Sequence, residues 1–93
     1  MNHITRHDEQ TTALRRIEGQ VRGLQSMIAD GEYCIDIITQ ICAAINALYA
    51  VAEKILSKHI EHCVVEAFRS DSSEEKEEKI SEIMAVVHRL RKL

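Results

Sequence analysis

The residues best suited to chemistry are two imidazoles and a thiol in the stretch SKHIEHC, residues 57–63. His59 and Cys63 are four positions apart, so on a helix they lie one turn apart on the same face. An imidazole nitrogen and a thiolate on one face make a workable pair of metal ligands. Two ligands do not complete a site, so the sequence has to supply a third.

Cys34 is the best candidate for the third ligand, although it is 25 residues before His59 in the same predicted helix. That separation corresponds to about 37 Å along an unbroken helix, and no proline or glycine lies between them to fold the chain back. In an antiparallel dimer, however, the start of one long helix lies beside the end of its partner. The spacing therefore predicts a site between subunits, with Cys34 from one chain and His59 and Cys63 from the other.

Two thiolates and one imidazole form a soft, three-coordinate ligand set, which suits Cu(I). Zn(II) would need a fourth ligand from His62, a carboxylate or water. Ni(II) would need further nitrogen or oxygen donors, such as His3, His7 or the N-terminus. The remaining candidates have simpler interpretations: His62 as a surface residue or one that supports the ligands, His88 as a surface residue, and Cys42 as a buried small apolar residue.

Three helices of medium, long and short length are predicted, which makes the fold class all-α. Thr5 with Asp8 resembles an N-cap and its acid, and Asp30-Gly31 is a stop signal for the first helix. The long helix is expected to run from about residue 32 to about residue 69 without a break. Ser72 and Glu75 form a predicted capping box for the third helix. The first helix carries an apolar stripe at positions 14, 17, 21, 24 and 28, and the long helix carries one at 38, 41, 45, 48, 52, 55, 59 and 63.

The length of the second helix has a consequence for assembly. About 38 residues at 1.5 Å each give about 57 Å, which exceeds what a compact monomer of this size spans. The rest of its apolar stripe must be covered by another chain. We therefore expect an antiparallel dimer bundle, assembling further as a dimer of dimers.

Composition and charge limit the class of protein. A chain of 93 residues without proline is at most one domain, with residues 1–5 expected as a mobile tail. Neither a membrane span of about 18 apolar residues nor a signal peptide is evident, which favours a cytoplasmic protein whose cysteines are thiols or ligands. The net charge is −3, but residues 1–29 carry +1. No loop or pocket suited to an enzyme is apparent.

Three segments, LRRIEGQVRGLQSMI, YCIDIITQICAAINAL and HIEHCVVEAF, resemble the copper-sensing operon repressor family, the CsoR/RcnR group. The similarity covers roughly residues 11–90, and the spacing Cys…His-x3-Cys together with RIEGQVRG makes it specific. The resemblance implies a small all-α repressor that assembles as dimers and dimers of dimers. Such a protein binds operator DNA without metal and releases it on binding metal.

The resemblance also assigns roles to residues. It supports Cys34, His59 and Cys63 as Cu(I) ligands, and it implies that Tyr33 and Glu82 hold the ligands in place and connect them to the last helix. The resemblance leaves the contacts with DNA phosphates to the arginines of the first helix, Arg15, Arg16 and Arg22. Two positions where the family often has arginine are Ala13 and Ala50, which affects the expected operator affinity.

Alternative functions keep the same scaffold. The nickel and cobalt sensors of the family have histidine at the position of Cys63, which argues against that branch, although their extra N-terminal ligand position falls at Asn2, beside His3. A thiol or persulfide sensor using Cys34 and Cys63 is a second alternative. Metal storage or delivery without DNA binding is a third.

Overall fold

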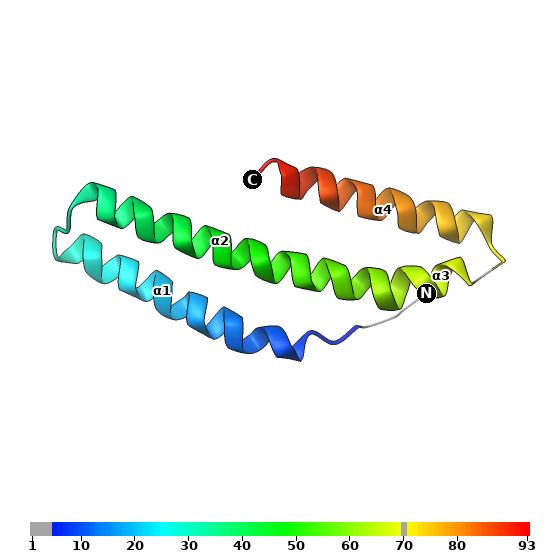
Figure 1. The fold of residues 1–93 in the computed structure, drawn as a ribbon, viewed down its shortest axis with the longest axis horizontal. Coiled ribbons are helices and arrows are strands. Elements are labelled where there is room, and N and C mark those ends of the chain that lie inside the picture. The colour runs from blue at the N-terminus through cyan, green and yellow to red at the C-terminus, as the bar shows by residue number, and fades with distance from the viewer. Residues whose placement is uncertain (1–4, 70) are drawn as a thin grey trace. The chain divides into compact units, whose positions relative to one another are not determined.

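The structure is a computed structural model that describes residues 5–69 and 71–93. In these residues all regular structure is helical, which confirms the all-α prediction (Figure 1). A short 3-10 turn, η1 (Asp8–Gln10), leads into α1 (Thr11–Ala29), and α2 (Cys34–His59) follows. A π-helical turn, η2 (Ile60–Val64), then connects α2 to α3 (Val65–Phe68), and α4 (Ser73–Arg91) ends the chain. The chain divides into two compact units, which are described separately.

The first unit, residues 7–55, is a helical hairpin of α1 and most of α2. Its N-terminal boundary differs from the prediction, because His7 rather than Thr5 occupies the N-cap position and makes no side-chain capping hydrogen bond. The first turn is a 3-10 turn, which leaves Thr5 outside the helix. The predicted tail is residues 1–5, of which residues 1–4 lie outside the described part of the chain.

The turn between α1 and α2 follows the predicted stop signal. Gly31 has a positive φ of 68°, a conformation that costs other residues steric energy and suits glycine. The Gly31 N–H donates to the Ile28 carbonyl at 3.1 Å, and the Glu32 N–H donates to the Met27 carbonyl at 3.0 Å. This pair of bonds is a Schellman motif, which satisfies carbonyls that a helix end would otherwise leave unpaired. The motif reverses the chain and directs it into α2 (Figure 1).

Few residues of the hairpin unit are buried. Ile17, Ala44 and Val51 are 5–6% exposed, and they form its small core. The apolar stripe predicted on α2 remains largely solvent-exposed, with exposed fractions of 39–53% at Ile38, Ile41, Ile45 and Leu48. These four positions follow the a and d spacing of a heptad, the pattern with which a helix pairs with another helix. A single chain therefore leaves most of this stripe uncovered.

Cys42 was predicted to be buried, and this prediction is wrong for the single chain, because Cys42 is an exposed free thiol. It lies two residues before the buried Ala44, which corresponds to about 200° around the helix. It is therefore on the opposite side of α2 from that part of the core.

The second unit contains residues 1–6 and 56–93, and its helical path differs from the prediction of an unbroken long helix. α2 ends at His59, and the next five residues form the π-helical turn η2 before α3 resumes the α-helix. A π turn has i→i+5 hydrogen bonds and so holds one residue more than an α turn. Ala67 on α3 is completely buried.

α4 begins directly after Ser72, which is its predicted N-cap. Ser72 adopts an extended conformation, and its hydroxyl oxygen accepts a hydrogen bond from the Glu75 N–H at 3.2 Å. This contact satisfies one of the free N–H groups at the helix start. α4 lies against α3 and η2 within the same unit. The cap and this packing fix the start of the helix that carries Glu82.

By length and composition alone, the helical run Cys34–Phe68 is apolar enough to cross a membrane. A mostly buried core helix of a soluble protein passes the same test, whereas the most apolar window of this helical run is 11% buried within one chain. The heptad spacing of its exposed apolar residues is typical of a helix that pairs with other helices.

Candidate metal centre

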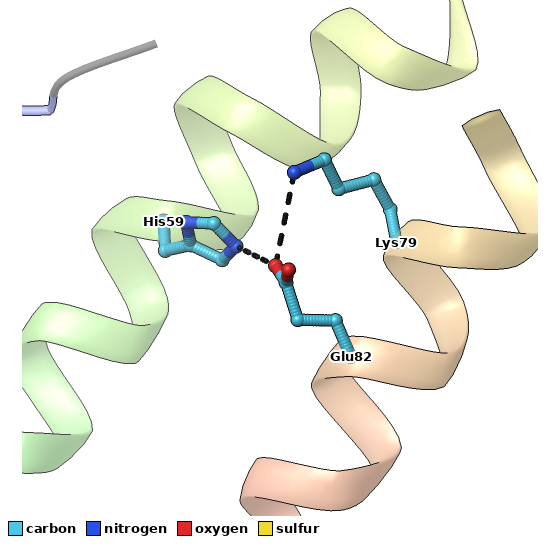
Figure 2. Close-up of polar contacts among 3 residues, drawn as sticks. All are labelled: His59, Lys79 and Glu82. Atoms are coloured by element: carbon cyan, nitrogen blue, oxygen red, sulfur yellow. Dashed lines mark hydrogen bonds and ion pairs between the residues drawn. The ribbon is translucent and has the colours of Figure 1, made fainter. Parts of the chain in front are cut away.

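His59 lies beside Glu82, and this contact is the centre of the candidate site (Figure 2). His59 is the last residue of α2, and Glu82 is in the middle of α4. The distance from His59 Nε2 to Glu82 Oε1 is 3.2 Å, with the two side chains 29% and 49% exposed. The two residues are 23 positions apart in sequence, so the contact depends on the packing of the second unit. The structure thus brings together one predicted ligand and one residue predicted to hold it.

The contact fixes which nitrogen of His59 is available to a metal. An ionised carboxylate only accepts hydrogen bonds, so His59 Nε2 must carry the proton that points at Glu82. In the neutral imidazole the lone pair is then on Nδ1. Metal-binding histidines commonly donate their other ring N–H to a carboxylate in this way. The contact with Glu82 therefore leaves Nδ1 as the unprotonated nitrogen of a neutral His59.

Lys79 is a third member of this cluster that the sequence did not single out. Its ammonium nitrogen lies 3.8 Å from the same Glu82 oxygen, in an i, i+3 pair on α4. Figure 2 shows the Glu82 carboxylate between the His59 ring and the Lys79 ammonium group. Because Glu82 is half exposed, this ion pair stabilises the fold by at most about 1 kcal/mol. Its main effect is to hold the carboxylate between two donors. The Lys-x2-Glu spacing was the available signal in the sequence.

Cys63 lies in the π-helical turn, directly after the helix that ends with His59. Its side chain lies outside the described part of the structure, so the pairing of His59 with Cys63 stays a prediction. The turn matters for this pair, because it changes the angle between positions 59 and 63 from that of an α-helix. His62, in the same turn, is exposed as predicted.

Cys34 and Tyr33 belong to the other unit, at the start of α2. Tyr33 is 68% exposed, and Cys34 is an exposed free thiol. Cys34 and His59 are the first and last residues of the same helix. Among the described residues, no group of three potential ligands gathers within one chain to hold a metal ion. A site with three ligands therefore requires a residue outside that part of the chain, such as Cys63 or His3, a second chain, or both.

Of the two histidines considered as Ni(II) ligands, the structure describes only His7. His3 lies outside the described residues. His7 is half-buried at the start of η1, and its Nδ1 has no hydrogen-bond partner in the described structure. His88 is exposed on α4, as predicted.

The predicted DNA-contacting residues, Arg15, Arg16 and Arg22, are exposed on α1. Arg15 and Arg22 are seven positions apart and so share one face, whereas Arg16 is about 100° away from Arg15 around the helix. α1 also carries Glu18, which reduces its net charge to +2. These arginines can meet phosphates, but the surface they form is only weakly basic.

Comparison with known proteins identifies the class to which this arrangement belongs. The family described as metal-sensitive transcriptional repressors matches residues 6–89. The copper-sensing repressor RicR of Mycobacterium tuberculosis is 42% identical over 83 residues, which are 89% of this chain and 85% of RicR. The copper-sensing repressor CsoR of Bacillus subtilis is 42% identical over 85 residues, which are 91% of this chain and 81% of CsoR.

Solved structures agree with these relatives. The copper-sensing repressor CsoR with Cu(I) from Geobacillus thermodenitrificans superposes with a TM-score of 0.82 at 40% identity, covering 96% of this chain and 94% of CsoR. The nickel-responsive regulator InrS superposes with a TM-score of 0.75 at 26% identity, covering 97% of this chain and 98% of InrS. Proteins of this kind regulate transcription and are not enzymes. The chain therefore belongs to the metal-sensitive transcriptional repressor family.

Proposed function

We propose that this protein is a cytoplasmic copper-responsive repressor, which binds operator DNA in the metal-free state and releases it when Cu(I) binds. The observation that carries the proposal is the contact between His59 Nε2 and Glu82, which leaves Nδ1 of His59 as a ligand atom. Copper-sensing relatives at 42% identity support the choice of metal. Bound Cu(I) would supply a centre that draws soft thiolate and imidazole ligands together.

The proposed ligands are His59 and Cys63 of one chain and Cys34 of another. The exposed heptad positions on α2 support pairing between chains, because they form an apolar face that one chain leaves uncovered. In an antiparallel pair, the start of one α2 lies beside the end of the other. The same face supports a homodimer, and we extend the proposal to a dimer of dimers.

Glu82 and Tyr33 are proposed to link the metal site to the rest of the protein. Glu82 comes from α4 and meets a ligand from α2, so a change in the position of His59 is transmitted to α4. Tyr33 directly precedes Cys34, so it is placed to sense that ligand. A coupling of about 1–3 kcal/mol between metal and DNA binding is typical of such switches. Arg15, Arg16 and Arg22 are the proposed phosphate contacts of the metal-free state.

A complementation experiment tests the intersubunit site directly. Cys34→Ala and Cys63→Ala chains each lack one proposed ligand, so each alone should lose tight Cu(I) binding in an anaerobic titration against a chelator. When the two variants are unfolded and refolded together, mixed dimers regain one of their two sites. Random pairing then restores about a quarter of the wild-type sites. A site contained within one chain would show no restoration, and that result would refute the proposal.

Metal and oxidant titrations of the same reduced protein distinguish two alternative functions. InrS is nickel-responsive, and Ni(II) would require nitrogen donors such as His7 or His3; Zn(II) would require a fourth ligand. Tight binding of Ni(II) or Zn(II), with DNA release by that metal and not by Cu(I), would favour these alternatives. A thiol or persulfide sensor would instead release DNA after mild oxidation and form Cys34–Cys63 crosslinked dimers on a non-reducing gel.

A further inference from the structure

The end of α4 gathers positive charge more strongly than any helix end in the described chain. Arg89, Arg91 and Lys92 lie within four residues, directly after His88. No acidic residue occurs between positions 83 and 93, so this segment carries +3 in a chain with net charge −3. All four of these side chains are exposed. We call Arg89, Arg91 and Lys92 the cationic arc.

The cationic arc lies on one side of α4. With about 100° per residue, Arg91, Lys92 and Arg89 span about 160° of the helix circumference. Leu90 points to the opposite side, and Leu90 and Val86 are half-buried there. The charges therefore face away from the side of α4 that packs, and they form a continuous surface toward solvent.

The chain's own acids do not neutralise these charges. A helical ion pair needs a partner three or four positions away, and the residues at these positions before the arc are Ala85, Val86, Val87 and His88. In the described part of the chain, the side chains of the arc make no hydrogen bond or ion pair. Lys79, by contrast, is engaged with Glu82.

The helix dipole explains only part of this charge. Cations are favoured at a helix C-terminus, where the dipole is equivalent to about −0.5 charge. Three positive charges exceed this several-fold, and one cation in the last turn would already offset it. Most of the charge of the arc is thus available to an external polyanion.

We propose that the cationic arc contacts the phosphate backbone of operator DNA, in addition to the arginines of α1. This inference rests on the proposed function, because it requires that the metal-free protein binds DNA. DNA is the polyanion on which a transcriptional repressor acts. The net charge of α1, +2, is a weak basic surface for a DNA-binding protein, and the cationic arc adds +3 per chain to it. Because α4 also carries Glu82, phosphate contacts at its end place part of the DNA interface on the helix that meets His59.

The salt dependence of binding measures such contacts. Each phosphate contact contributes about 0.9 to the slope of log K against log salt. Each lost contact should therefore reduce the slope by about 0.9 and, at about 0.1 M salt, weaken binding about eight-fold, so the effect multiplies with the number of chains that contact the DNA. Loss of three contacts would reduce the slope by about 2.7 per chain.

The experiment compares metal-free wild-type protein with a triple variant, Arg89→Gln/Arg91→Gln/Lys92→Gln. Binding to a DNA fragment of its own promoter is measured by fluorescence anisotropy between about 50 and 200 mM salt. A matched control, Lys54→Gln/Arg69→Gln/Lys76→Gln, removes the same charge elsewhere. A charge-preserving variant, Arg89→Lys/Arg91→Lys, separates electrostatic contact from structural damage. Circular dichroism verifies that each variant is helical.

The proposal expects a lower slope and weaker binding for the arc variant, with the control and the charge-preserving variant close to wild type. An unchanged slope in the arc variant would overturn it. An equal loss in the control would also overturn it, because net charge alone would then explain the effect. If wild-type protein binds no promoter fragment at all, the proposed function itself fails. If wild-type protein binds DNA and the arc variant binds with the same slope, only the inference about the cationic arc fails.

Discussion

Glu82→Gln tests whether the carboxylate beside His59 prepares the metal ligand. The substitution keeps the size of the side chain, and its amide oxygen can still accept a hydrogen bond. It removes the negative charge, and its amide nitrogen can turn toward His59 Nε2 and favour the wrong tautomer. Nδ1 would then carry the proton in part of the population and would be unable to bind metal. We expect weaker Cu(I) binding with little change in the fold.

The size of the effect follows from the geometry. A hydrogen bond to a charged group contributes about 1.5–3 kcal/mol. The contact here is 3.2 Å long and Glu82 is 49% exposed, so water competes for the carboxylate and the lower end applies. About 1.4 kcal/mol corresponds to a ten-fold loss of affinity. Replacing such supporting residues typically costs about 10- to 100-fold in metal affinity, which agrees with this value.

The assay is an anaerobic Cu(I) titration of reduced protein against a competing chelator. Glu78→Gln is the matched control, because Glu78 is exposed on α4 one turn before Glu82. DNA affinity without metal should be the same for wild type and both variants, since the contact acts on the metal ligand. A dissociation constant for Glu82→Gln within about two-fold of wild type would refute the reasoning, as would an equal loss in Glu78→Gln.

Four further outcomes are expected. Ser72→Ala should lower the free energy of unfolding by about 1 kcal/mol in a urea titration, because the N-cap is lost, whereas Ser81→Ala within α4 should not destabilise. Gly31→Ala should cost about 1 kcal/mol in the same measurement, because alanine is strained at positive φ. Ile45→Asp should shift sedimentation from oligomer to monomer, and Asn46→Asp on another face of α2 should not. Cu(I) affinity should fall from about pH 7.5 to about pH 5.5, because the thiols and the imidazole must lose protons to bind; a flat profile would count against thiolate ligands.

The sequence predicted features that depend on local chemistry. The helix cap at Ser72 and the helix end at Gly31 can be predicted from a few neighbouring residues. A serine hydroxyl can accept a hydrogen bond from a nearby N–H, and glycine adopts a positive φ more easily than other residues. The exposed stripe on α2 followed from helix length and periodicity. The contact of His59 with Glu82 was expected only from resemblance, since nothing local connects residues 23 positions apart.

Other features were not predictable in the same way. The residues of the π turn, IEHCV, fit the apolar period of an α-helix. The i→i+5 backbone hydrogen bonds of a π turn require no particular side chains, so the sequence does not reveal them. Thr5 and Asp8 had the spacing of a cap, yet the helix begins with a 3-10 turn and His7 occupies the N-cap position. The spacing of Lys79 and Glu82 does not distinguish this ion pair, because a lysine in an acidic helix resembles any surface cation. At the π turn and at the start of the first helix, the backbone path rather than residue type decided the outcome.

The π turn changes how the helical sequence should be counted. One additional residue in the turn advances the following residues by about 100° around the axis and by about 1.5 Å along it. The heptad phase that holds up to His59 therefore stops there, and α3 starts in a new phase. Removing one residue between 60 and 64 would restore an unbroken phase, with all later side chains rotated by that angle. The π turn thus sets the helical phase of α3 relative to the last turn of α2.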